Sequence, residues 1–236
     1  MIFLQNSRNH RIDHAEIRNA NIGIYLGTPD DDDEPDLELS NTRIENIGGN
    51  SIIPSIDSLV QPGFGILAIS SDLYAYNVLI NNCEINLLAN VAGGNYRYEH
   101  CTFANFSFNF FRRDPSVAFS NNLILGDGSL LVGNTTISMT NSILWGSLSE
   151  ELLVSDAEEA SLTIELNNNI LQTQLPQFQN DNFFDDPRFF SPSEYDYRLD
   201  TLSPAKDIGL PLKITVAYNG MLSDVLPDLG AFERIE

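Results

Sequence analysis

Lysine is almost absent from this chain of 236 residues, which contains only Lys206 and Lys213. Lysine and arginine together number 12 against 33 aspartates and glutamates, so the formal net charge is −21. A surface of this charge repels phosphate backbones and anionic lipid headgroups. The composition therefore excludes nucleic acid as an expected partner.

Cysteine and long apolar segments are also scarce. Cys83 and Cys101 are too few for a disulfide scaffold or a four-ligand zinc site. The apolar runs are short, so no segment is expected to span a bilayer, and the residues after Met1 lack the pattern of a signal peptide. Because these opening residues already have the pattern of a strand, we favour a chain that begins after its export signal over one that stays inside the cell.

Asparagine is abundant, with 25 residues, and most of its positions follow one short repeat. The repeat has six positions: apolar, any residue, Asn or His, small or polar, any residue, apolar. Self-similarity of this kind is typical of repeat architectures. Seven copies occur, at residues 12–17, 39–44, 80–85, 98–103, 119–124, 139–144 and 166–171.

The spacing of the copies predicts the fold class. Successive copies start 27, 41, 18, 21, 20 and 27 residues apart, which is irregular but has a minimum near twenty. A helical repeat would keep a constant period and would avoid asparagine, a poor helix former. A coil of about twenty residues, built of short strands with longer loops at one corner, is typical of a parallel β-helix. We therefore predict an all-β chain wound as a right-handed parallel β-helix.

The repeated asparagine has a structural explanation. At a sharp bend between two strands, Asn tolerates left-handed backbone angles, and stacked carboxamides can hydrogen-bond along a column. His14 and His100 are interpreted as substitutes for Asn in this column rather than as catalytic groups. The predicted ladder consists of His14, Asn41, Asn82, His100, Asn121, Asn141 and Asn168.

The two cysteines occupy the position after the ladder residue, where small side chains would point inward. Cys83 and Cys101 are 18 residues apart, close to one minimal coil, so we expect them on adjacent coils. Buried free thiols are the favoured interpretation, and a disulfide between neighbouring coils is the alternative.

Several segments resemble a known family. Asn141–Gly146 reads NSILWG, and the C-terminal quarter contains the blocks DPRF, DYRL, SPAKDIG and PDLGAFE, beginning at Asp186, Asp196, Ser203 and Pro227. Together they resemble the right-handed parallel β-helix repeat proteins of the pectate-lyase-like superfold, in the form common on bacterial cell surfaces, especially in Bacteroidetes. The closing block is similar to those that precede an anchoring or sorting segment. A D-x-x-G-x-x-R stretch usual before the last block is eroded in this chain, which leaves the subfamily open.

The resemblance implies a cell-surface or extracellular protein and a polysaccharide or cell-envelope glycan as partner. We expect a monomer with two parts, the coils in residues 1–180 and a tail in residues 181–236. The tail loses the repeated Asn and gains Pro, Phe and Tyr. Since the last coil of a solenoid is an open edge that needs a cap, we expect the tail to lie across that end.

No catalytic residue is identified from the sequence. Acid and base carboxylates of a glycoside hydrolase lie roughly 5 to 9.5 Å apart, as on neighbouring coils. No two carboxylates are neighbours in the second or the fifth position of the repeat. In the fifth position Glu16, Arg43 and Glu84 alternate in charge, which predicts a surface ion-pair ladder of small energetic value.

Two binding sites are candidates. The acidic run is the first place to expect Ca²⁺, because carboxylates are its preferred ligands, although a solvated charge run is the alternative. This run consists of Asp30, Asp31, Asp32, Asp33, Glu34 and Asp36.

An aromatic and cationic surface able to bind a glycan would form if Tyr96, Arg97, Arg112 and Arg113 project from one face. The alternating phenylalanines of residues 106–111 predict a strand that faces the core.

Two functional hypotheses follow. The first is a non-catalytic surface or secreted β-helix, either structural or glycan-binding. The alternative is a polysaccharide lyase or glycoside hydrolase whose catalytic coils lie outside this chain, or whose catalytic residues lie in the loops 25–36 and 53–75.

Overall fold

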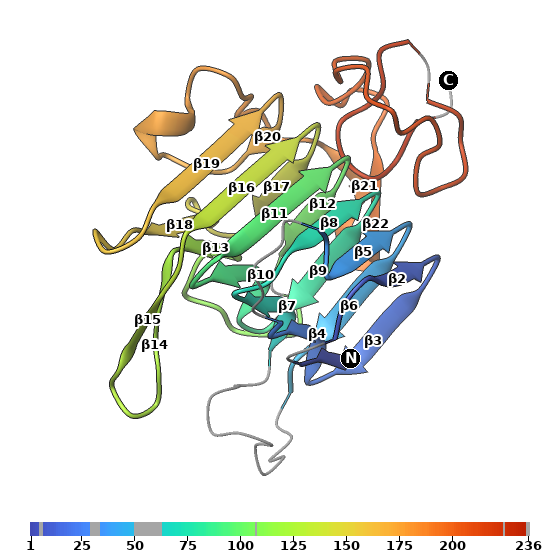
Figure 1. Ribbon diagram of the computed structural model, residues 1–236. Helices are drawn as coiled ribbons and strands as arrows, with labels where there is room; N and C mark the ends of the chain where they lie inside the picture. The colour runs from blue at the N-terminus through green and yellow to red at the C-terminus, as the bar shows by residue number, and fades with distance from the viewer. Residues whose placement is uncertain (5–6, 29–33, 50–62, 107, 224, 235–236) are drawn as a thin grey trace.

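The computed structural model describes residues 1–4, 7–28, 34–49, 63–106, 108–223 and 225–234 (Figure 1). Three parallel sheets of six strands each dominate these residues. The chain visits the sheets in turn, so one strand of each makes one coil, and successive coils stack in register. The predicted all-β, right-handed parallel β-helix is confirmed, with six strands in each sheet in place of the seven repeats expected.

The strands are short, as the length of a coil requires. Sheet A consists of β1 (Ile2–Phe3), β4 (Ile22–Leu26), β7 (Phe64–Ile69), β10 (Asn86–Val91), β13 (Val117–Ser120) and β18 (Leu152–Ser155). Sheet B consists of β2 (His10–Asp13), β5 (Leu37–Ser40), β8 (Leu73–Tyr76), β11 (Gly94–Glu99), β16 (Thr135–Thr140) and β19 (Leu162–Asn167). Sheet C consists of β3 (Glu16–Ala20), β6 (Arg43–Ile47), β9 (Leu79–Cys83), β12 (Thr102–Asn105), β17 (Ile143–Gly146) and β20 (Ile170–Leu171).

Two antiparallel hairpins and two short 3₁₀ helices interrupt or follow the coils. The first hairpin, β14 (Asn122–Ile124) and β15 (Leu130–Val132), projects from the body of the molecule beside β13 (Figure 1). The second hairpin pairs β21 (Phe189–Ser191) with β22 (Asp196–Leu199). The 3₁₀ helices are η1 (Pro176–Phe178) and η2 (Pro192–Glu194).

The core fills the space between the three sheets. Alternate residues of each strand point inward, so Leu37 and Leu39 of β5 are fully buried. Burying one such aliphatic side chain contributes about 1.5–3 kcal/mol, and stacked coils repeat that gain. Tyr96 and Tyr98 are also buried, and each hydroxyl has a partner: Tyr96 donates to the carbonyl of Gly93 at 2.7 Å and Tyr98 to Asn90 Oδ1 at 2.9 Å.

The ladder lies at the corner between sheets B and C. Its members adopt left-handed backbone angles, with φ between 45° and 58°. The Asn77 amide donates to Asn41 Oδ1 at 3.1 Å, and the Asn168 amide donates to Asn141 Oδ1 at 2.9 Å. The structure places six residues in this column: His14, Asn41, Asn77, His100, Asn141 and Asn168.

The predicted ladder is wrong for two residues. Asn82 lies at the corner between sheets C and A, where its amide donates to Asn46 Oδ1. Asn121 lies at the corner between sheets A and B, where it donates to Asp156 Oδ1 at 2.7 Å. Asn77 was missed. The cause is that more than one corner of a coil requires a sharp bend, so the six-residue pattern also matches at corners other than the ladder.

The two cysteines lie on adjacent coils, and both are buried free thiols. Cys101 follows the ladder and receives support from Ser142, whose hydroxyl accepts its backbone N–H at 3.0 Å. Cys83 is instead the last residue of β9, whereas Cys101 precedes the first residue of β12, so the two cysteines do not share a column. Burial raises the pKa of both thiols, that of Cys101 to about 12.

We expect neither thiol to react with a disulfide reagent in the native protein, because only the thiolate attacks and burial disfavours it. A colorimetric thiol assay should count no reactive cysteine before unfolding and two afterwards. Reaction of one thiol at native pH, at a rate typical of free cysteine, would contradict the burial described here.

The first residues of the tail lie at the end of the β-helix, whereas most of the tail runs along its side, so the cap is shorter than expected. Apolar residues on the outer face of sheet C pack against it, including Leu79, Ala104 and Ile143. Their partners in the tail are Phe189, Tyr197, Leu199, Ala205 and Leu229. The end of the core is covered by Leu175 and Phe178, just before the tail, and by Phe184 at its start.

The outer face of sheet C explains where the tail lies. In β3 and β6 this face is charged, and Arg18 pairs with Glu45 at 2.8 Å and with Glu16 at 3.0 Å. From β9 onward the same face is apolar and needs a cover. Arg43 also pairs with Glu45, so these two strands carry an ion-pair network. Glu84 is outside it, and its carboxylate accepts the backbone N–H of Gly49 at 2.8 Å.

Candidate functional site

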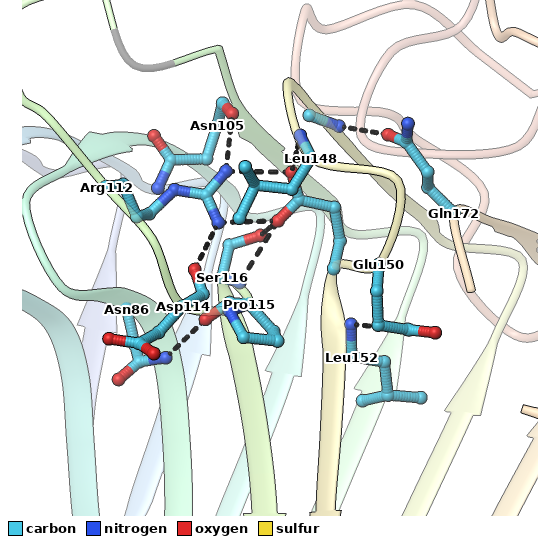
Figure 2. Close-up of polar contacts among 12 residues, drawn as sticks. Asn86, Asn105, Arg112, Asp114, Pro115, Ser116, Leu148, Glu150, Leu152 and Gln172 are labelled. Atoms are coloured by element: carbon cyan, nitrogen blue, oxygen red, sulfur yellow. Dashed lines mark hydrogen bonds and ion pairs between the residues drawn. The ribbon is translucent and has the colours of Figure 1, made fainter. Parts of the chain in front are cut away.

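Arg112 is buried in an ion pair and cannot contact a glycan, which contradicts its predicted role. Its guanidinium makes two contacts of 2.7 Å with the carboxylate of Glu151, and the two side chains are 1% and 0% exposed. Arg112 also donates to the carbonyls of Asn105 and Asp114, at 3.0 and 2.7 Å (Figure 2). Ser116 donates to Glu151 through its N–H and its hydroxyl. The cluster therefore fixes the loop after β12 to the next coil.

The other predicted glycan-binding residues do not share a face. Tyr96 points into the core, whereas its neighbour Arg97 points outward from sheet B. Arg113 is exposed on the loop between β12 and β13, with its guanidinium 5.3 Å from the ring of Phe111. The surface expected from these residues is therefore not formed. The segment 106–111, predicted as a strand, is a loop in its described residues, and Phe111 is exposed.

The predicted calcium site falls partly outside the described residues, which omit Asp30, Asp31, Asp32 and Asp33. Glu34 is exposed. Asp36 is buried and accepts hydrogen bonds from the hydroxyl of Thr28 at 2.5 Å and from the N–H of Asp72 at 2.9 Å. Asp36 therefore holds the corner between sheets A and B. Among the described residues, no group of three or more His, Cys, Asp or Glu side chains is placed to hold a metal ion. Calcium binding stays a prediction.

The outer face of sheet B, which we call the sheet B face, carries two columns of polar and aromatic side chains. The strand register fixes both columns, because every second residue of a strand points the same way. One column is Arg11, Glu38, Tyr74, Arg97, Ser138 and Glu165. The other is Asp13, Ser40, Tyr76, Glu99, Thr140 and Asn167.

Two tyrosines of β8 occupy the middle of this face and are held by carboxylates on both sides. The rings of Tyr74 and Tyr76 are 5.3 Å apart between centroids. The hydroxyl of Tyr74 donates to Glu99 at 2.7 Å, and that of Tyr76 donates to Glu38 at 3.3 Å. The Arg97 guanidinium lies 5.0 Å from the Tyr74 ring and donates to Glu99 through Nε at 2.9 Å. This network fixes the orientation of both rings.

The electrostatics of the network keep Tyr74 and Arg97 in their ordinary charge states. Burial and the hydrogen bond to Glu99 raise the pKa of Tyr74, so the phenol stays protonated at neutral pH. The hydrogen bond with Glu99 also raises the pKa of Arg97. Tyr74 and Arg97 thus hold the Glu99 carboxylate from two directions.

A groove of about 440 Å³ lies between the sheet B face and the tail. Glu38, Tyr74 and Tyr76 line it from the sheet, and residues 213–217 with Gly220 line it from the tail. Ladder residues complete the lining where the strands end: His14, Asn41 and Asn77.

The ladder and the tail are joined at the groove itself. The Asn77 amide donates to the carbonyl of Val216 at 2.6 Å, so the tail wall is anchored to the same column that ends the sheet B strands. Arg97 was predicted as a binding residue from the sequence, whereas Glu38, Tyr74, Tyr76 and Lys213 were not. The signal for the two tyrosines was present, since Leu73 and Ala75 alternate with them and point inward.

The acidic groups near the groove are engaged within the protein. Asp13 accepts hydrogen bonds from Asn41 at 2.9 Å and from Ser40 at 2.8 Å, and these lower the pKa of Asp13 to about 2. The ring of His14 lies 2.9 Å from the same carboxylate. An acid of such low pKa does not supply a proton near neutral pH.

The fold and this groove define the chain as a right-handed parallel β-helix protein with an aromatic groove between one sheet and its tail. No family model and no curated protein matches the chain. Among solved structures, the crystal structure of pectate lyase Pel9A is similar to it, with a TM-score of 0.48 and 15% sequence identity. The alignment covers 94% of this chain and 54% of the pectate lyase, so the chain spans about half of that protein's length. None of the described helices is long and apolar enough to cross a membrane.

Proposed function

We propose that this chain is a non-catalytic, surface or secreted β-helix that binds a glycan in the groove on the sheet B face. The observation that carries the proposal is the pair of tyrosines, Tyr74 and Tyr76, which line the groove with their rings fixed by Glu99 and Glu38. Tyrosine offers an apolar ring together with a polar tip, which suits a ligand that is apolar on one face and hydroxylated at its edges.

The arrangement favours binding for two physical reasons. A groove of about 440 Å³ falls within the range of ordinary ligand sites, roughly 300–1,000 Å³. The rings are already held by hydrogen bonds, so binding loses less side-chain entropy than it would with free rotamers. The formal charge of −21 favours solubility and disfavours contact with anionic partners.

The groove lacks the chemistry of a hydrolase in its described residues. Asp13 is held ionised by Asn41 and Ser40, while Glu99 is bonded to Tyr74 and Arg97. Glu38 accepts from Tyr76. A glycoside hydrolase needs one protonated acid and one base or nucleophile on opposite sides of the bond. These engaged carboxylates support a binding role.

Replacing Tyr74 and Tyr76 together by alanine is expected to weaken glycan binding at least tenfold, because each stacked ring contributes about 1 kcal/mol and 1.4 kcal/mol corresponds to a factor of ten. Affinity electrophoresis in gels containing soluble polysaccharides measures this directly. Phe111→Ala is the matched control, since Phe111 is an exposed aromatic residue outside the groove. Equal retardation of the double variant and the control in every gel would remove the groove as the binding site.

The native chain is expected to release neither reducing ends nor unsaturated products from neutral polysaccharides or polyuronates. His14→Asn and Glu38→Gln are the informative variants, because these residues line the groove and carry the groups best suited to proton transfer. Robust turnover that either substitution abolishes would overturn the non-catalytic assignment and favour the enzyme alternative.

A further inference from the structure

We propose that the groove selects glycans without carboxylates, neutral or amino sugars, over polyuronates. This inference rests on the proposed function and concerns the chemistry of its ligand. It follows from which groups around the groove still accept hydrogen bonds and which have already donated their protons.

Both tyrosine hydroxyls have used their only proton within the protein. Tyr74 donates to Glu99 and Tyr76 donates to Glu38. A hydroxyl has one donor and two acceptor lone pairs, so toward the groove these hydroxyls present acceptors. Glu38 adds carboxylate oxygens, which only accept.

Three of the four amide protons of the ladder asparagines that line the groove are engaged within the protein. Asn77 donates to Asn41 and to the carbonyl of Val216. Asn41 in turn donates to Asp13 at 2.9 Å. The wall formed by sheet B and the ladder therefore offers mainly oxygen acceptors, and a ligand that donates many hydrogen bonds is its complement. Sugar hydroxyls and the ammonium of an amino sugar donate, whereas a uronate carboxylate only accepts.

The charges around the groove also favour neutral or amino sugars over polyuronates. A uronate bound beside Tyr76 would place its carboxylate near Glu38 and the ionised Asp13, and like charges at short range repel. The opposite wall carries a single cation, Lys213, which is exposed to solvent. The two arginines of the sheet B face lie outside the groove lining: Arg97 is paired with Glu99, and Arg11 lies 3.7 Å from Glu38 and 3.9 Å from Asp13.

The test is a comparison of soluble polysaccharides by affinity electrophoresis and titration calorimetry at low and high ionic strength. The neutral probes are hydroxyethyl cellulose, xyloglucan and galactomannan, the polyuronates are polygalacturonate and alginate, and chitosan carries the amino sugar. We expect at least one neutral probe or chitosan to bind tenfold or more tightly than either polyuronate at low ionic strength. Glu38→Gln should shrink that ratio severalfold, because it replaces an acceptor by an amide and removes the charge.

Glu165→Gln is the matched control, since Glu165 lies in the same column of the sheet B face but outside the groove and is expected to leave the ratio unchanged. Preferred binding of a polyuronate that is lost in the Tyr74→Ala/Tyr76→Ala variant would overturn the selectivity and keep the proposed function. Binding of none of the probes would overturn the proposed function and the selectivity with it.

Discussion

Replacement of Arg112 by methionine is expected to lower the free energy of unfolding by about 3–5 kcal/mol, the usual effect of removing one partner of a buried ion pair. The reason is the environment of Glu151, which is fully buried and would be left without its counterion. The lost contacts with the carbonyls of Asn105 and Asp114 would also release the loop that joins two coils.

Urea unfolding followed by circular dichroism measures the effect as a change in midpoint. Arg113→Met is the control, because the neighbouring guanidinium is exposed and its removal should change stability by less than about 0.5 kcal/mol. The double variant Arg112→Met/Glu151→Leu should be more stable than Arg112→Met alone, since no buried charge is then left unpaired. Equal stability of Arg112→Met and Arg113→Met would contradict the structural role of the pair.

Replacement of Asn141 by alanine is expected to destabilise the protein by about 3 kcal/mol and to loosen the tail. Its carboxamide oxygen accepts from the N–H of Leu210 and from Asn168, both at 2.9 Å, and its amide donates to the carbonyl of Leu210 at 2.8 Å. The amide also contacts His100 Nε2 at 3.0 Å, and burial lowers the pKa of His100, so that ring is neutral and can accept. Each hydrogen bond contributes about 0.5–1.5 kcal/mol net.

The backbone adds a second term, since Asn141 has a φ of 52°. A left-handed conformation costs alanine about 1–2 kcal/mol, whereas glycine adopts it freely. Asn141→Gly should therefore be about 1 kcal/mol more stable than Asn141→Ala while losing the same hydrogen bonds. Hydrogen exchange at residues 208–212 reports on the tail, with the exposed Asn167→Ala as control. Protection that is unchanged in Asn141→Ala would show that the ladder does not hold the tail.

The fold was readable from the sequence because a tight corner is a local requirement. Residues such as Asn41 and Asn141 adopt left-handed angles, and few residue types tolerate them, so the corners are visible as a repeat. The alignment of successive coils could be predicted only in part. Ala75–Ile80 contains the ladder residue Asn77 but has the apolar Val78 where the pattern requires a small or polar residue, whereas Ile80–Ile85 fits at every position. The pattern also does not say which of the three corners it marks.

The site combines local contacts, which the sequence can predict, with contacts between residues far apart in the chain, which it cannot. Alternation along one strand is local, and Tyr96 was predictable as buried, since it lies two residues from Tyr98, which begins a repeat at an inward position. The pairing of Arg112 with Glu151 joins residues 39 positions apart across an inserted loop, and no sequence pattern marks it. The tail wall of the groove, including Lys213, comes from a segment that folds back along the coils, and the only hint is the apolar outer face of sheet C.

Fluorine NMR of the protein labelled with 3-fluorotyrosine tests the central claim most directly, because the chain has eight tyrosines and only two of them line the groove. Titration with the polysaccharide that binds best should shift the resonances of Tyr74 and Tyr76 saturably and leave that of Tyr25, which lies in β4 of sheet A, in place. Assignment by single tyrosine-to-phenylalanine variants makes each resonance specific. Saturable shifts confined to tyrosines outside the groove, with Tyr74 and Tyr76 unmoved, would contradict the account.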